Sequence, residues 1–177
     1  MRWSVCLLAT SAIVLAIVAV RANPAAGRGD NTQIERGKYL VQLGGCNDCH
    51  TPGYLLGKPD LSSYLGGSNV GLEVQGAGTF VGRNLTPDKE TGLGNWTKKQ
   101  IVIAIQTGVR PDGRLLAPVM PWRAYSRLTK SDAGAIADYL RSLPPVRHDV
   151  PGPFGPSQKP TVVRMTLVPP DANYQSK

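Results

Sequence analysis

The stretch Gly44–Pro52, GGCNDCHTP, contains two of the three cysteines and one of the two histidines of this 177-residue chain. Cys46, Cys49 and His50 place two thiols and an imidazole within one short turn. Side chains of these types bind zinc, form a disulfide or hold a haem, and each alternative makes different demands on the rest of the sequence. The choice among the three decides which fold is expected.

Zinc and a redox dithiol fit the sequence poorly. A structural zinc site needs four ligands, but the turn offers three, and the adjacent side chains of Cys49 and His50 point in different directions. No second Cys-x-x-Cys pair exists in the chain. A redox Cys-x-x-Cys pair usually lies between a strand and a helix of a βαβ unit, whereas the segment before Cys46 has a helical pattern.

The pattern Cys-x-x-Cys-His is the attachment site of c-type haem. In such a site the thiols of Cys46 and Cys49 add to the two vinyl groups and form thioethers, and His50 binds the iron as proximal ligand. The short spacing is needed because the vinyl groups lie on neighbouring pyrroles. The sequence therefore predicts one covalent haem c with iron bound by His50.

The N-terminal segment predicts export of the chain. Trp3–Val20 is an apolar run, followed by small residues that suit a cleavage site after Ala22. Residues 1–22 resemble a secretory signal peptide, but a run of about 18 residues is also long enough for an uncleaved membrane anchor. Both alternatives place the rest on the periplasmic side, where thiols usually form disulfides unless something captures them. Cys6, inside the run, is interpreted as an apolar filler.

The distribution of charge argues against nucleic-acid binding. The formal net charge is +8, but residues 30–145 hold 13 basic and 10 acidic side chains, and two haem propionates would nearly balance them. The chain has no basic block and no alternation of basic and aromatic residues. A near-neutral middle region favours neither an acidic nor a basic protein partner.

Three helices are predicted, over residues 32–43, 97–108 and 129–143. Thr32 and Glu35 form a capping box at the expected start of the first helix, which should end at the glycine pair before the cysteine turn. The second and third helices also begin at a threonine. A glycine ends the second helix and a proline pair ends the third.

Two long segments have little pattern. Residues 51–95 are rich in glycine, proline, asparagine and serine, and we expect them to gain order by packing on the cofactor. Residues 146–177 are rich in proline, and only Thr161–Val168 has strand character. This tail is expected to be a disordered extension, a strap across the domain or a docking segment for a larger partner.

Three segments, taken in order, resemble those of a known family. They are RGKYLVQLGGCNDCHTP (36–52), GRNLTPDKETGLGNW (82–96) and MPW with the last helix (120–145). All three are similar to segments of class I c-type cytochromes, in particular the cytochrome c subunits of membrane-associated periplasmic dehydrogenases. The resemblance covers about residues 31–145.

The resemblance implies an all-α fold with long loops wrapped around the haem. The first and last helices are expected to cross, with the small Gly37 allowing close approach to Tyr139. The resulting division has four parts, which are a signal peptide or anchor (1–22), a leader (23–30), a cytochrome c domain (31–145) and a proline-rich extension (146–177).

The resemblance also implies a second iron ligand between the second and last helices. Met120 lies there, and the flanking Pro118 and Pro121 should stiffen its loop because proline fixes φ. Ligation by histidine and methionine raises the reduction potential and suits electron transfer. His148 and an open distal site are the alternatives.

Further candidates lie in the segment expected to meet the haem propionates. Arg83, Asn84 and Trp96 are predicted to contact the haem there, because guanidinium and indole N–H groups are good donors to carboxylates. The alternatives are a solvated charge for Arg83 and an apolar anchor for Trp96. The carbonyl before Pro52 or before Pro59 is expected to accept the free N–H of the proximal histidine.

Together these features predict an electron carrier rather than an enzyme. It would exchange one electron at a time between Fe(II) and Fe(III), with a dehydrogenase as donor and an oxidase or cytochrome as acceptor. One alternative is a cytochrome subunit that works only inside a dehydrogenase or oxidase complex. Another is a catalytic or sensing haem with an open distal site.

Overall fold

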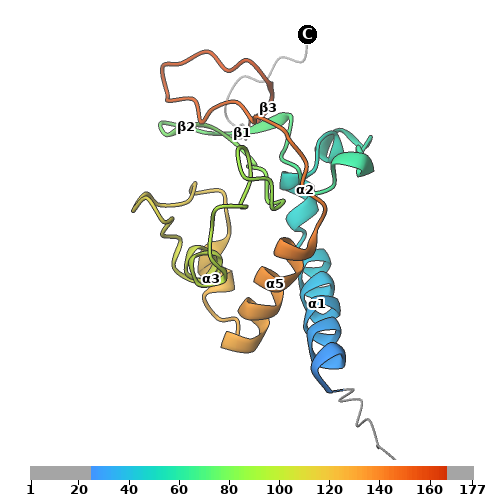
Figure 1. The fold of residues 1–177 in the computed structure, drawn as a ribbon. Coiled ribbons are helices and arrows are strands. Elements are labelled where there is room, and N and C mark those ends of the chain that lie inside the picture. Colours follow the sequence, from blue (N-terminus) through green and yellow to red (C-terminus); the bar gives the residue numbers. More distant parts are fainter. Residues whose placement is uncertain (1–24, 167–177) are drawn as a thin grey trace, which may run out of the picture.

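The helices gather on one side of the molecule and the strands on the other (Figure 1). The computed structural model describes residues 25–166, so the predicted signal peptide or anchor lies outside the described residues. In chain order the elements are α1 (Ala25–Leu43), α2 (Cys46–His50), η1 (Tyr54–Leu56), η2 (Leu61–Ser63), β1 (Val70–Val74), β2 (Gly78–Val81), α3 (Lys98–Thr107), α4 (Trp122–Tyr125), α5 (Lys130–Ser142) and β3 (Val163–Thr166). Within this part of the chain no helix is long and apolar enough to cross a membrane.

The expected all-α fold is wrong, because the chain also forms a three-stranded mixed sheet of order β2-β1-β3. Strands β1 and β2 make an antiparallel hairpin, with Gly71 opposite Val81. Strand β3 adds to β1 in parallel, with Val70 opposite Val163. The strand character predicted for the tail is thus confirmed by β3, whereas the hairpin was missed.

Glycines weaken the strand pattern of the β1–β2 hairpin in the sequence. Val70, Leu72 and Val74 alternate with other residues as in a strand. Gly71 lies between them and weakens this signal because glycine is disfavoured in strands. It is needed there because a Cβ would lie 2.4 Å from Thr79 Cγ2 on the paired strand. The turn between the strands is glycine-rich, and a short apolar run beside such a turn is the signal that could have revealed β1 and β2.

Helix α1 begins well before its predicted start. It runs from Ala25, so Thr32 lies inside the helix and the predicted capping box is wrong. The reason is that residues 25–31 contain no proline, and a helix continues through a capping sequence when no residue stops it.

The caps of the other two helices are confirmed. Thr97 and Gln100 form a capping box at the start of α3, and Gly108 ends that helix with φ of 75°. Thr129 caps α5, where its side chain accepts the Asp132 N–H at 3.0 Å.

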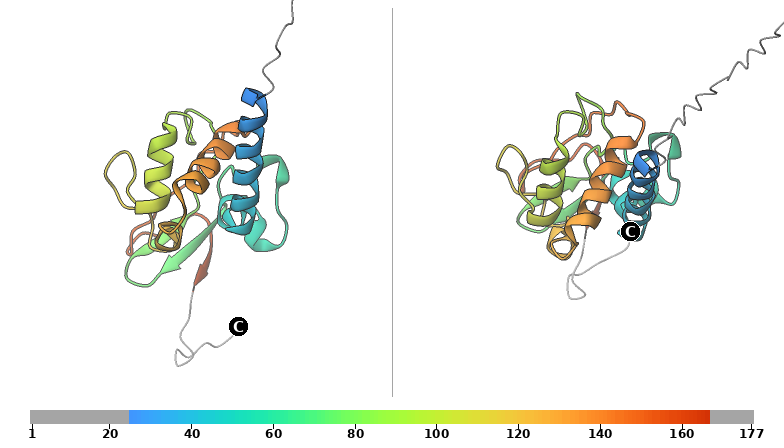
Figure 2. Two further views of the ribbon diagram at one scale, coloured as in Figure 1. Left: turned by 90° about the horizontal axis from the view of Figure 1, so that it is seen from below. Right: turned by 60° about the horizontal axis from the view of Figure 1, so that its bottom comes forward.

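Helices α1 and α5 cross at Gly37, as expected, and lie side by side in Figure 2. A Cβ at Gly37 would lie 2.0 Å from the Ala135 carbonyl oxygen and 2.8 Å from Tyr139 Cβ. The core forms around this crossing because the apolar faces of α1, α3 and α5 meet there. Its buried members are Val41, Leu65, Ile101, Ile136, Ala137, Tyr139 and Leu140.

The described part of the tail, residues 146–166, follows the strap alternative. Phe154 pairs with Thr79 on the outer edge of β2, with backbone bonds of 2.8 and 2.9 Å. Further along, β3 pairs with the other edge of the hairpin. The tail therefore contacts both edges of the hairpin and encloses it.

The close approach at Gly37 makes a first prediction. We expect Gly37→Ala to lower the free energy of unfolding by about 2–3 kcal/mol, because the new methyl group must displace helix α5. Gly134→Ala on α5 is a matched control, since its Cβ would meet only the end of the Lys98 side chain, with Cε at 3.5 Å and Nζ at 3.7 Å. That control should be neutral or gain about 0.5–1 kcal/mol from helix propensity. Urea unfolding of both variants checks this, and equal losses would contradict the crossing.

Candidate haem-binding site

The predicted attachment residues form one short helix, α2, which begins directly after Gly45 in a left-handed conformation. Cys46 and Cys49 are both unpaired and partly buried. The backbone of Gly82 packs on this turn so closely that a Cβ there would overlap the Cys49 carbonyl oxygen. The residue that follows β2 therefore packs against the cysteine turn and holds it in place.

Burial sets the protonation state of the two thiols. It raises the pKa of Cys46 to about 11, and it also raises the pKa of Cys49. Both are therefore protonated at neutral pH, whereas the attacking thiol of a redox dithiol has a lowered pKa. Residues 25–166 contain no group of three or more histidine, cysteine or acidic side chains arranged to bind a metal ion. The raised pKa values argue against a reactive redox dithiol.

His50 is neutral and fixed in one orientation. It is buried, and this burial lowers its pKa. Its Nδ1 lies 2.6 Å from the Arg83 carbonyl oxygen. A carbonyl only accepts, so Nδ1 carries the hydrogen and Nε2 keeps its lone pair for a metal. The expected acceptors before Pro52 and Pro59 are wrong, because β2 brings the backbone of residue 83 to the ring.

The backbone around His50 is also tightly held. The Gly67 N–H donates to the His50 carbonyl at 2.8 Å, and the Leu65 N–H donates to Thr51 Oγ1 at 3.0 Å. Leu65 has φ of 57°, which is unusual for a side chain of this size. Leu65 and Thr51 are fully buried, so this strained segment is part of the packed frame around the proximal side of the site.

Met120 lies in a tight turn directly before α4. Its N–H donates to the Ala117 carbonyl at 3.0 Å, and its own carbonyl accepts the Trp122 N–H at 2.8 Å. The Tyr125 hydroxyl donates to the Gly44 carbonyl at 2.8 Å. One hydrogen bond therefore ties the element that follows Met120 to the start of the cysteine turn. Iron ligation by Met120 itself stays a prediction.

Three arginines gather beside the site, two of which sequence reasoning missed. Partial burial and the charges of Arg110 and Arg114 lower the pKa of Arg83. The Arg110 guanidinium lies over the Trp96 ring, 5.8 Å from its centroid. The available signal was the RPDGR turn (110–114), which carries a basic residue at each end.

The buried Arg110 Nε has no hydrogen-bond partner among the described residues, whereas the Tyr64 hydroxyl lies against Tyr139. Tyr64 and Trp96 both pack against the core cluster, as does Cys46. Unpaired buried donors are costly, so each requires an acceptor. The carboxylates of a haem are such acceptors, and the three arginines outnumber the single Asp112 that pairs with Arg110 and Arg114. The residues present therefore fit the predicted group.

Asn84 is buried, and its amide is fully used inside the protein. Its Nδ2 donates to Thr91 Oγ1 at 3.0 Å and to the Val146 carbonyl at 2.6 Å. Its Oδ1 accepts the N–H and the hydroxyl of Thr86 at 2.9 and 2.7 Å. In this arrangement Asn84 joins the loop to the tail, and its predicted contact with the haem stays a prediction.

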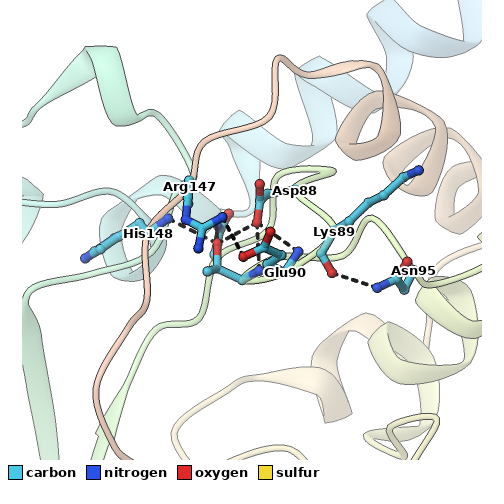
Figure 3. Close-up of polar contacts among 8 residues, drawn as sticks. Asp88, Lys89, Glu90, Asn95, Arg147 and His148 are labelled. Atoms are coloured by element: carbon cyan, nitrogen blue, oxygen red, sulfur yellow. Dashed lines mark hydrogen bonds and ion pairs between the residues drawn. The ribbon is translucent and has the colours of Figure 1, made fainter.

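His148 lies close to the backbone segment that holds His50. Its Nδ1 contacts the Gly66 carbonyl at 2.9 Å, next to the residue that holds the backbone of His50. Figure 3 shows Arg147 and His148 of the tail beside the 88–91 loop, where Arg147 pairs with Glu90. The His148 N–H also donates to Thr91 Oγ1 at 3.1 Å. These bonds fix His148 against the proximal frame, which disfavours it as the opposite ligand.

Comparisons with known proteins confirm the predicted resemblance to c-type cytochromes that serve dehydrogenases. The chain is 34% identical over 137 residues to the cytochrome c subunit of a quinone-dependent alcohol dehydrogenase from Gluconacetobacter polyoxogenes, covering 77% of the chain and 27% of that subunit. It is 33% identical over 166 residues to the fructose dehydrogenase cytochrome subunit of Gluconobacter japonicus, covering 89% of the chain and 31% of that subunit. It is 29% identical over 140 residues to a diheme cytochrome of c type from Cereibacter sphaeroides, covering 76% of the chain and 46% of that protein.

The first two relatives are much longer than the part that matches, so the chain spans about a quarter to a third of their length. No model of a known protein family matches the chain. The similarity extends beyond the Cys-x-x-Cys-His turn, since it includes most of the described residues.

Proposed function

We propose that the chain is a c-type cytochrome that carries single electrons on the periplasmic side, from a dehydrogenase to an oxidase or another cytochrome. When bound, haem c supplies the one-electron Fe(III)/Fe(II) couple. The observation that carries the proposal is the α2 turn, where two unpaired thiols stand beside a neutral imidazole fixed by the Arg83 carbonyl. The chain contains one such turn, and we infer one haem.

Each residue of the site has a defined part in this proposal. Cys46 and Cys49 would hold the haem through thioethers, and His50 would present Nε2 to the iron. Met120 would supply the second protein ligand from its constrained turn. A weak thioether ligand stays in place only when its loop is held, which the Tyr125 bond to the cysteine turn supports.

The unpaired Arg110 Nε would meet the propionates. It gains an acceptor there, and Trp96 lies beneath the Arg110 guanidinium. Guanidinium–carboxylate bonds are strong in such partly buried places. The same positive charges favour Fe(II) over Fe(III), because reduction removes one positive charge from the iron, and they therefore raise the reduction potential.

The partner is inferred from the relatives, which are named as cytochrome subunits of alcohol and fructose dehydrogenases. A dehydrogenase that oxidises a small alcohol or sugar is therefore the proposed donor. The second candidate is a subunit that works only inside such a complex, which the enclosing strap also allows. Placement in the periplasm rests on the export signal predicted for residues 1–22.

The test is a spectrum of the exported protein, oxidised and reduced, into the near infrared, followed by a redox titration. We expect one covalent haem per chain, a low-spin spectrum, a weak sulfur-to-iron band and a one-electron transition. A high-spin haem that binds carbon monoxide readily would instead indicate an open distal site and a catalytic or sensing role. Copurification with a large dehydrogenase would favour the complex-bound alternative.

A further inference from the structure

We propose that residues 146–154, here called the clasp, position the proximal histidine and thereby set the reduction potential of the iron. The inference rests on the proposed haem function. The clasp does not contact His50 directly. It acts through two residues that do, Arg83 and Gly67.

Arg83 joins the clasp to the imidazole ring. Its carbonyl accepts the His50 Nδ1–H at 2.6 Å. Its side chain turns the other way, where Nη1 donates to three successive clasp carbonyls, those of Val150 at 2.6 Å, Pro151 at 3.4 Å and Gly152 at 3.0 Å. Bonds from a charged donor are stronger than neutral ones. The backbone that orients the ring is therefore anchored by the tail.

Gly67 joins the clasp to the backbone of the same histidine. Its N–H donates to the His50 carbonyl at 2.8 Å. Val150 is 3% exposed and packs on this glycine, since a Cβ at Gly67 would lie 2.3 Å from Val150 Cγ2. Next to it, His148 contacts the Gly66 carbonyl. Arg83 and Gly67, the two residues whose backbone groups bond to His50, thus both contact the clasp.

The clasp is itself fixed at both ends. At its start the Val146 N–H donates to Thr86 Oγ1 at 3.0 Å, and the Val146 carbonyl accepts from Asn84. At its end Phe154 pairs with Thr79 of β2. Because both of its ends are bonded, the clasp cannot move with Arg83 without breaking these bonds. It therefore holds the Arg83 side chain in place.

The expected effect follows from the chemistry of an axial imidazole. A hydrogen bond from Nδ1–H to a carbonyl makes the ring a stronger donor to the metal. A stronger donor stabilises Fe(III) relative to Fe(II) and lowers the reduction potential. Loosening Arg83 should weaken this bond and raise the potential.

The variant that tests this is Arg83→Lys in the full-length haem protein. It keeps the positive charge, so the field at the iron changes little, but its side chain is one atom shorter and ends before the position of Nη1, which makes all three contacts with the clasp. Arg141→Lys is the matched control, because Arg141 Nη1 donates to the Trp96 carbonyl at 2.9 Å, with no contact to the clasp among its hydrogen bonds in the described chain. Two quantities are measured, the reduction potential and the rate of hydrogen exchange at His50 Nδ1, observed by NMR.

We expect Arg83→Lys to raise the potential and to speed Nδ1–H exchange about tenfold, as for the loss of one hydrogen bond. Arg141→Lys should leave both at the wild-type values. Val150→Ala, which leaves Arg83 intact, should shift both quantities in the same direction as Arg83→Lys and by less. It also serves as the informative variant if Arg83→Lys fails to fold.

Wild-type values for both measures in Arg83→Lys, or in Val150→Ala if only that variant folds, would overturn the clasp and leave the electron carrier standing. Equal shifts in the Arg83 and Arg141 variants would also overturn it, because the effect would then be general loosening. A wild-type chain without covalent haem would overturn the carrier and the clasp together. The haem content of the wild type therefore separates the two failures.

Discussion

A Met120→Ala variant is expected to lose the sulfur-to-iron band in the near infrared and to have a much lower reduction potential than the wild type. A thioether is a soft ligand that favours Fe(II), and its loss leaves water or an open position. The fall should be a sizeable part of the roughly 0.8 V over which axial ligands move haem potentials. The variant should also bind carbon monoxide, whereas the wild type should not.

The structure supplies a matched control for this prediction. Met165 lies on β3, where it is 48% exposed, while Met120 lies partly buried in the turn before α4. Met165→Ala removes the same side chain and should leave spectrum and potential unchanged. A Met120 variant that keeps the near-infrared band would exclude this residue as ligand.

Replacing both cysteines of α2 by alanine should abolish covalent attachment of the haem. Cys46 and Cys49 are the thiols expected to form the two thioethers, so denaturing gels of the double variant should show no haem stain. Acid extraction should release any haem that remains. Single variants should keep one thioether and resist extraction. Asn47→Ala, which alters the same turn without touching a thiol, is the control.

Loss of the cofactor should also destabilise the fold. A group bound only to the folded state stabilises that state by an amount that grows with the logarithm of the group's concentration relative to its dissociation constant. At a thousandfold excess this is about 4 kcal/mol, and we expect at least that loss in the double variant. Buried donors such as Arg110 Nε would then have no carboxylate to meet. Urea unfolding measures the difference, and unchanged stability would contradict a packed cofactor.

Local signals in the sequence predicted local structure well. Thr97 and Gly108 mark the ends of α3 because capping depends on residues within one turn of each other. The α2 turn was predicted for the same reason, since its chemistry depends on five consecutive residues. Thr32 is the exception, as the residues before it decide whether a capping sequence is used.

Apart from the crossing of α1 and α5 at Gly37, which the family resemblance implied, the main features that depend on distant residues were not predicted. The acceptor for His50 is the carbonyl of Arg83, which reaches the ring only because the β1–β2 hairpin returns the chain to α2. The sheet itself needs β3, which lies beyond all the helices in the sequence. Neither the spacing of apolar residues nor the composition encodes such pairings. The arginine cluster and the contacts of the tail are therefore visible only in the three-dimensional structure.

The parallel pairing of β1 with β3 also orders the events of biosynthesis. A chain is made from its N-terminus, so the α2 turn is complete while most of the sequence is still to come. Pairings between distant residues form late because a large loop must close first. The cysteines would therefore be open to the enzymes that attach haem before the strap encloses the hairpin. Closure of the strap then completes the fold, and resistance of the tail to proteases should appear last.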